Sequence, residues 1–364
     1  MLQYLLKRLG LVIPTLLGIF TLNFFVIQMT PGGPVEQFIA SLEGTGSVWM
    51  ERVGTAQGDP GAMSAAAEPA SQGLLRGTPP EIVAAVERLY GFDRPVGERY
   101  LDMLGDYLTF DFGESFFKAD PVISLIREAL PVSMTLGIWS TLLIYMVSVP
   151  LGIARAVRRN SAFDVWTGTA VVVASAIPGF LFAVLLIVLF AGGSYLQIFP
   201  LRGLHSPGFE EMSFAGQTLD YLHHICLPVI SLSIGGFAGL TLLTRNSFLD
   251  ELGKQYVELA RAKGVSERTV LLGHVFRNAM LIVISGLPGT FVRMFFAGSL
   301  LIETIFSLNG LGLLGFEATM QRDYPVMFAT LWIFTLIGLV ANIAGDIVMH
   351  FVDPRIDFTA RGRA

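Results

Sequence analysis

Apolar residues along this chain gather into six long runs, and the polar residues concentrate in the segments between them. A helix needs about 20 predominantly apolar residues to cross the hydrocarbon core of a bilayer. The runs that meet this length span residues 9–29, 134–153, 166–190, 225–244, 279–302 and 327–349. The pattern therefore predicts an all-α polytopic membrane protein with six transmembrane helices.

The segments that connect the runs predict how the chain is oriented in the lipid bilayer. Lys and Arg near the ends of transmembrane helices concentrate on the cytoplasmic side. With the N-terminus inside, fourteen basic residues fall in cytoplasmic segments, whereas the two short external loops hold one each, Arg202 and Arg322. We therefore expect both termini in the cytoplasm, with residues 1–30 forming the N-terminal end and first transmembrane helix and residues 351–364 a cytoplasmic tail.

The long segment 31–130 is then an external domain. Residues 41–77 are rich in Gly, Ala, Ser and Pro without periodicity, which predicts a flexible insert. An amphipathic helix is expected over residues 95–110. Its predicted apolar face consists of Tyr100, Met103, Leu104, Tyr107 and Leu108. Residues 303–326 are apolar but interrupted by glycines, which predicts a hairpin or half-helix at the outer face.

The composition agrees with a membrane protein and argues against several kinds of site. Only 15% of the residues are charged, against about 25% in soluble domains. The single cysteine, Cys226, excludes an intrachain disulfide and a multi-cysteine metal cluster. His223 and His224 lie close to it, but adjacent helical residues point about 100° apart, so we favour an interfacial helix start over a metal site. No basic and aromatic patch indicates a nucleic acid partner.

The sequence shows no catalytic or cofactor-binding constellation. The phosphate-binding pattern G-x-x-x-x-G-K-[ST] is absent, so the chain is not expected to bind ATP by itself or to be an enzyme. Arg293 and Asp346 fall within or near apolar runs, where ionisable groups are functional candidates. Arg293 either lines a translocation path or is a snorkelling or paired structural charge. Asp346 and His350 are interpreted as facing the cytoplasmic end.

The polar segment 245–278 is the longest cytoplasmic loop and reads as a helix, a tight turn and a second helix. Good helix formers over "SFLDELGKQYVELARAKG" carry an apolar stripe. That stripe consists of Phe248, Leu252, Tyr256 and Leu259. Gly264 lies where a left-handed residue would end the first helix, and Ser266 is placed to cap the second, "ERTVLLGHVFRNAM". The turn is expected to expose Leu259 and Val265, which suggests a contact with a partner.

This segment resembles the EAA-x-x-x-G loop of the membrane subunits of ATP-binding-cassette (ABC) importers, with Leu259 as a departure from its second residue. Three stretches are similar to the oligopeptide and dipeptide permease branch of this family: "YVELARAKG", "YGFDRPVGERYLDMLGDYLTFDFGES" and "SLLIETIFSLNGLGLL". Gly33 and the insert 41–77 are similar to the Yej-type subfamily of that branch. The resemblance implies a type I ABC importer fold for residues 131–350. It also implies an ATPase-coupling loop consisting of Glu258, Leu259, Ala260, Arg261, Ala262, Lys263, Gly264 and Val265.

By the same resemblance, the expected function is import of a peptide substrate across the bacterial inner membrane by alternating access. The expected partners are a second, homologous permease, one or two ATPase subunits that hold ATP and Mg²⁺, and a periplasmic peptide-binding protein. A permease for nickel or another small solute is the alternative within transport. A self-contained channel or secondary transporter, or a membrane-anchored scaffold, is the alternative from a different class.

Overall fold

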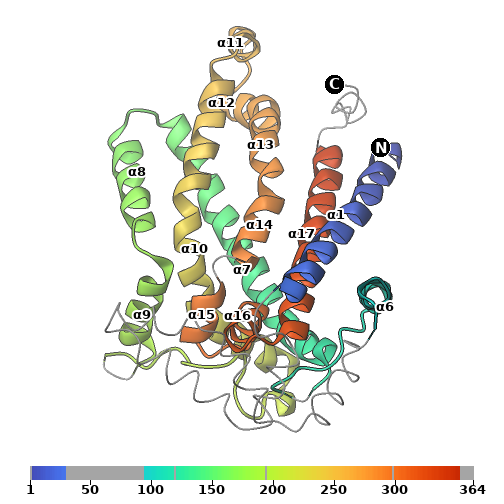
Figure 1. Cartoon of the computed structure of the whole chain (residues 1–364). Helices are drawn as coiled ribbons and strands as arrows, with labels where there is room; N and C mark the ends of the chain where they lie inside the picture. The colour runs from blue at the N-terminus through green and yellow to red at the C-terminus, as the bar shows by residue number, and fades with distance from the viewer. Residues whose placement is uncertain (1, 30–93, 119, 193–194, 297–298, 353–364) are drawn as a thin grey trace, which may run out of the picture. The chain divides into compact units, whose positions relative to one another are not determined.

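The structure is a computed structural model that describes residues 2–29, 94–118, 120–192, 195–296 and 299–352. The regular structure in these ranges is helical, which confirms the predicted fold class (Figure 1). The α-helices are α1 Leu2–Met29, α6 Val96–Leu108, α7 Val122–Val157, α8 Ala162–Ser175, α9 Gly179–Phe190, α10 Phe214–Leu252, α11 Gln255–Ala262, α12 Glu267–Thr269, α13 Phe276–Ser285, α14 Leu287–Phe296, α15 Ser299–Ile305, α16 Leu311–Gln321 and α17 Tyr324–Val352. The insert 41–77 lies outside the described residues.

Five stretches of helix are long and apolar enough to cross a membrane: Arg8–Val26, Val122–Val157, Phe214–Leu252, Glu267–Val292 and Tyr324–Phe351. The predicted span 166–190 is instead two helices, α8 and α9, with a bend of 94° between them. Pro178 lies at this break, as the residue that precedes α9. Proline has no amide hydrogen to donate and disfavours helical geometry in the residue before it, which favours a break in the helix at this point. The part of the chain that the structure describes thus has up to six candidate spans, when the bent pair is counted as one.

The fifth predicted span, 279–302, is described as far as Phe296 and again from Ser299. It comprises the end of α13, all of α14 and the start of α15. Where the glycine-interrupted segment 303–326 predicted a hairpin or a half-helix, the structure has the end of α15 and the separate short helix α16. Glu303 on α15 is fully buried and accepts hydrogen bonds from the Ser133 hydroxyl (2.9 Å) and the Leu313 amide (2.7 Å). These bonds fasten the connection between α15 and α16 to α7.

The chain divides into two compact units, of which the larger comprises Met1–Gly10, Glu128–Leu313 and Leu336–Ala364. α10 is the central helix of this first unit and packs against α8, α9 and α13. Small residues let α10 approach α7 closely, because a Cβ added at Gly152 would come within 2.8 Å of the Thr241 carbonyl oxygen. α10 can therefore carry displacement from one end of this unit to the other.

The second unit comprises Leu11–Arg127 and Leu314–Thr335. Within it, α6 turns an aromatic face toward α1, with Tyr100 and Tyr107 both packed edge-on against Phe20 at ring-centre distances of 5.3 Å. The predicted apolar face is correct for Tyr100, Met103, Leu104 and Tyr107, which are buried or half-buried. It is wrong for Leu108, which is 66% exposed because it lies at the last position of α6, beyond the packed aromatic residues.

Candidate functional site

The polar segment forms a projecting knob, residues 253–269, that we call the α11 knob. It lies at one end of the first unit, beyond the end of α10 (Figure 1). The expectation of one helix from Phe248 to Gly264 is wrong, because α10 ends at Leu252 and α11 begins at Gln255. Gly253 and Lys254 separate the two helices, and Lys254 has an extended backbone with ψ of 145°. This break redirects the chain and turns α11 into a short helix of its own.

The turn after α11 has the geometry that the sequence predicted for Gly264. Gly264 has φ of +80°, the left-handed region in which a residue without Cβ is favoured. The amide of Val265 donates to the carbonyl of Ala260 (3.2 Å), and that of Gly264 to the carbonyl of Arg261 (2.9 Å). These two bonds define a Schellman motif, which satisfies the last carbonyls of α11. The knob therefore has a fixed end.

The second helix of the knob starts at the predicted cap. The Ser266 hydroxyl accepts a hydrogen bond from the Thr269 amide at 3.3 Å. Arg261 on α11 donates to both carboxylate oxygens of Glu267, at 2.8 and 3.1 Å, which closes the turn from outside. After α12 the chain passes through a π-helical segment, Val270–Val275, before α13. The predicted α-helix is thus interrupted by a wide turn next to the knob.

The knob packs on an apolar base formed by α10, α11 and the π-helical segment. Phe248, Val257, Val270 and Val275 have no exposed surface and belong to one apolar cluster. Burial of such side chains, at about 1.5–3 kcal/mol each, is enough to hold a short helix that is not stable alone. The predicted stripe is therefore correct at Phe248 and at the half-buried Leu252, which packs on the same cluster. It is wrong at Tyr256 and Leu259, because Val257 points into the base instead.

The eight predicted coupling residues are brought together on this knob. Leu259 is 57% exposed, and it is surrounded by the exposed residues Glu258, Arg261, Ala262, Lys263 and Gly264. Ala260 and Val265 are half-buried and pack on the cluster beneath, so Val265 is not the exposed apolar residue that was expected. Leu259 is therefore a large apolar side chain exposed on a short helix that the cluster beneath holds in place.

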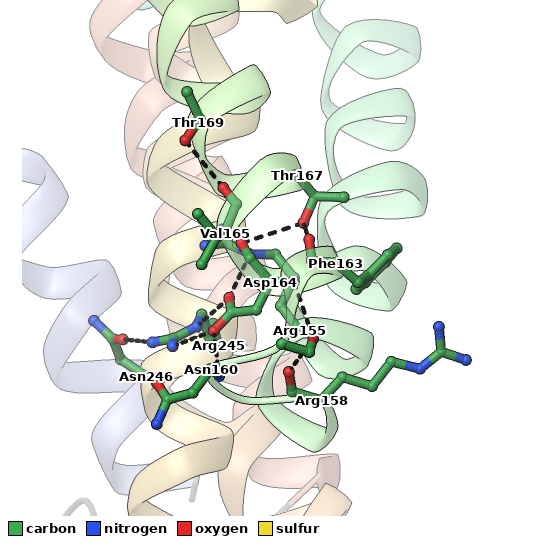
Figure 2. A network of polar contacts seen from close by, with 11 residues as sticks. Arg155, Arg158, Asn160, Phe163, Asp164, Val165, Thr167, Thr169, Arg245 and Asn246 are labelled. Atoms are coloured by element: carbon green, nitrogen blue, oxygen red, sulfur yellow. Dashed lines mark hydrogen bonds and ion pairs between the residues drawn. The ribbon is translucent and has the colours of Figure 1, made fainter.

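A buried ionic network, which the sequence reading did not identify, lies at the same end of the first unit (Figure 2). Asp164 on α8 accepts from Arg155 Nε on α7 at 3.0 Å. Arg245 on α10 donates to both of its oxygens, from Nε at 2.9 Å and Nη2 at 2.6 Å. The Asn160 amide supplies a fourth bond at 3.2 Å. The signal available in the sequence was an acidic residue in the first turn of an apolar run, after the basic stretch "RAVRRN".

The remaining candidate residues do not form a site with these. Arg293 belongs to α14, and its side chain lies outside the described residues, so its role stays a prediction. Asp346 forms an ion pair with Arg8. His223 and His224 bind different carbonyl oxygens, those of Ile198 (2.7 Å) and Asp220 (2.8 Å). Among the described residues, no three His, Cys, Asp or Glu side chains are arranged to hold a metal ion.

Comparisons with known proteins identify a matching family and similar full-length proteins. A model of the family described as "Binding-protein-dependent transport system inner membrane component" matches residues 148–358, which include the knob and Asp164. The chain is 57% identical to the inner membrane ABC transporter permease protein YejB of Escherichia coli O157:H7, over 98% of this chain and 99% of the relative. It is 51% identical to the peptidoglycan transport system permease protein YejB of Agrobacterium fabrum, over the same shares.

A more distant relative is the oligopeptide transport system permease protein AppB of Bacillus subtilis. It is 34% identical, over 98% of this chain and 100% of the relative. The similarity to all three relatives therefore covers nearly the whole length, beyond the residues that the family model matches. The chain belongs to the family of binding-protein-dependent transport system inner membrane components, and within it is similar to the YejB-type permeases of ABC transporters.

Proposed function

We propose that this chain is the permease subunit of an ABC importer that carries peptides across the bacterial inner membrane. The names of its full-length relatives support a peptide substrate, since they include oligopeptide and peptidoglycan transport. Partners of the importer would be a second, homologous permease and a periplasmic peptide-binding protein.

The observation that carries the proposal is the α11 knob. Its exposed Leu259 and its Schellman turn form a compact projection, while its apolar base joins it to α10 and α13. A separate ATPase that binds this projection can pull or push on two membrane helices at once. ATP and Mg²⁺ would be held by that ATPase. Closure of the ATPase around nucleotide would then switch the permease pair between outward-open and inward-open states.

Copurification tests the ATPase contact. The chain should bring an ATPase with it from detergent-solubilised membranes, and Leu259→Asp should lose it, because a carboxylate cannot be desolvated in an apolar groove without a partner. Leu196→Asp is the matched control, since Leu196 is also exposed (48%) but lies far from the knob, in the segment between α9 and α10. A channel or secondary transporter would purify without an ATPase in all three forms.

The chain is a multi-pass inner-membrane protein, and we further propose that both of its termini are cytoplasmic. In a background with Cys226 replaced by Ala, Lys118→Cys should react with an impermeant maleimide added to intact spheroplasts. Ser266→Cys should react only after the membrane is opened. Both positions are exposed in the structure, so reactivity reports the side of the membrane. The reverse labelling pattern would contradict the proposed orientation and place the knob on the wrong side for an ATPase.

A further inference from the structure

The buried network at Asp164 joins two consecutive helices, α7 and α8, to the distant helix α10. Arg155 is in the last turn of α7, Asp164 is in the first turn of α8, and Arg245 lies near the end of α10. Asp164 and Arg155 are 4% and 6% exposed. Both oxygens of the carboxylate receive two donors each, so Asp164 is fully saturated. Its loss would therefore release all three helices at one point.

The surrounding chain is shaped for this network. Gly168 lies one turn further along α8, and a Cβ there would collide with the guanidinium group of Arg155. Asn160 adopts φ of +59°, an uncommon value for a residue with a side chain, and its amide thereby reaches the Asp164 carboxylate. Ser161 caps α8 through the Asp164 amide at 3.3 Å. These features hold Asp164 in one position rather than leaving it a mobile surface charge.

The network is also connected rigidly to the α11 knob. Arg245 lies two helical turns before the end of α10, a distance of about 10 Å along the axis. Between them, Phe248 anchors α10 in the base of the knob together with Val257. Displacement of the knob must therefore move Arg245, and the two bonds from Arg245 to Asp164 carry that displacement to α8.

Stability alone is a poor explanation for such a group. Two arginines share one carboxylate, so the network has an excess positive charge, and the Nη1 atom of Arg155 is buried without an acceptor among the described residues. Desolvation makes buried ion pairs weak contributors to stability compared with apolar packing. In some proteins such pairs fix a single geometry instead, because the alternatives leave a buried charge unpaired.

We propose that Asp164 is the positioning residue that transmits movement of the α11 knob to α7 and to the bent α8–α9 pair. This inference rests on the proposed function, in which the knob binds the ATPase. The knob moves α10 directly, through the base. Asp164 then makes α7 and α8 follow, so that three membrane helices move together with each nucleotide cycle.

The test uses the complete transporter in liposomes, with its binding protein, and measures uptake of radiolabelled trialanine per ATP hydrolysed. Asp164→Asn should assemble with the ATPase yet lower this ratio at least about fivefold, the low end of typical coupling between sites. Arg245→Gln should act in the same direction and is the milder variant if Asp164→Asn folds poorly. Arg245→Lys, which retains the charge, should restore part of the ratio.

Arg158→Gln is the matched control. Arg158 lies between Arg155 and Asp164 in the sequence, but its side chain contacts the Phe163 ring instead of Asp164. The distance from its guanidinium carbon to the ring centre is 5.2 Å. This variant should keep the wild-type ratio. A role in stability alone would lower the yield and melting temperature of Asp164→Asn but leave uptake per ATP unchanged in the complexes that assemble. That outcome would overturn the proposal.

A distance measurement separates this inference from the proposed function. Spin labels at Trp166→Cys on α8 and Arg268→Cys on α12, with Cys226 replaced, report whether α8 stays fixed to the knob. The wild-type pair should give one narrow distance distribution, and Asp164→Asn a broader one, in this chain even without an ATPase. An unchanged distribution in Asp164→Asn would overturn the inference. Failure of the wild-type chain to bind any ATPase would instead contradict the proposed function.

Discussion

Gly264→Val is expected to abolish peptide uptake while the protein still inserts into the membrane. The φ of +80° at Gly264 lies in a region that costs a residue with a Cβ about 1–2 kcal/mol, and a β-branched side chain more. Nothing lies within 4 Å of a Cβ added there, so the penalty comes from the backbone and from the partner surface. Relief of that strain would break the Schellman bonds and detach the end of α11.

The measurement is peptide-stimulated ATP hydrolysis alongside uptake by the reconstituted transporter. Both should fall to background in Gly264→Val, and less ATPase should copurify. Gly113→Val is a matched control, because Gly113 also has positive φ (+73°) and open space around its Cα, but belongs to the second unit. Gly113→Val should incur the same backbone strain, and the wild-type amount of ATPase should still copurify with it. Wild-type uptake by Gly264→Val would contradict the role proposed for the knob.

The knob shows which local features could be predicted from sequence. Gly264 and Ser266 were correctly placed because each acts through bonds to residues within five positions of it. The break at Gly253 and Lys254 was missed because the residues around it favour a helix, and packing of Val257 into the base decides its position. Tertiary contacts thus override local propensity where the helix is short.

The ionic network was not predictable in the same way. Arg245 and Asp164 are separated by 81 positions, and a sequence reading counts each arginine only as a charge near a membrane end. The bend before α9 did have a local signal in Pro178, but the length of the apolar run favoured a single span. Run length therefore predicted how many times the chain crosses the membrane better than it predicted the shape of each crossing.

Glu303→Ala is expected to destabilise the folded protein more than any surface substitution. Glu303 has no exposed surface, and its carboxylate accepts from Ser133 and from the Leu313 amide. A buried donor left without its acceptor costs about 1–3 kcal/mol, and the substitution leaves two such donors, the Ser133 hydroxyl and the Leu313 amide. We therefore expect a loss of roughly 3 kcal/mol or more. The thermal unfolding midpoint of the detergent-purified protein measures this.

Glu317→Ala is the control for this change. Glu317 is 40% exposed and pairs with the equally exposed Lys118 at 3.1 Å, and such surface pairs contribute about 0.2–1 kcal/mol. Its midpoint should stay close to that of the wild type, although the same side chain is removed. Because both variants remove the same side chain, the difference between their unfolding midpoints measures what burial and the buried hydrogen bonds of Glu303 contribute. If Glu303→Ala melts as Glu317→Ala does, the connection between α15 and α16 is held by packing, and the carboxylate bonds to Ser133 and Leu313 contribute little.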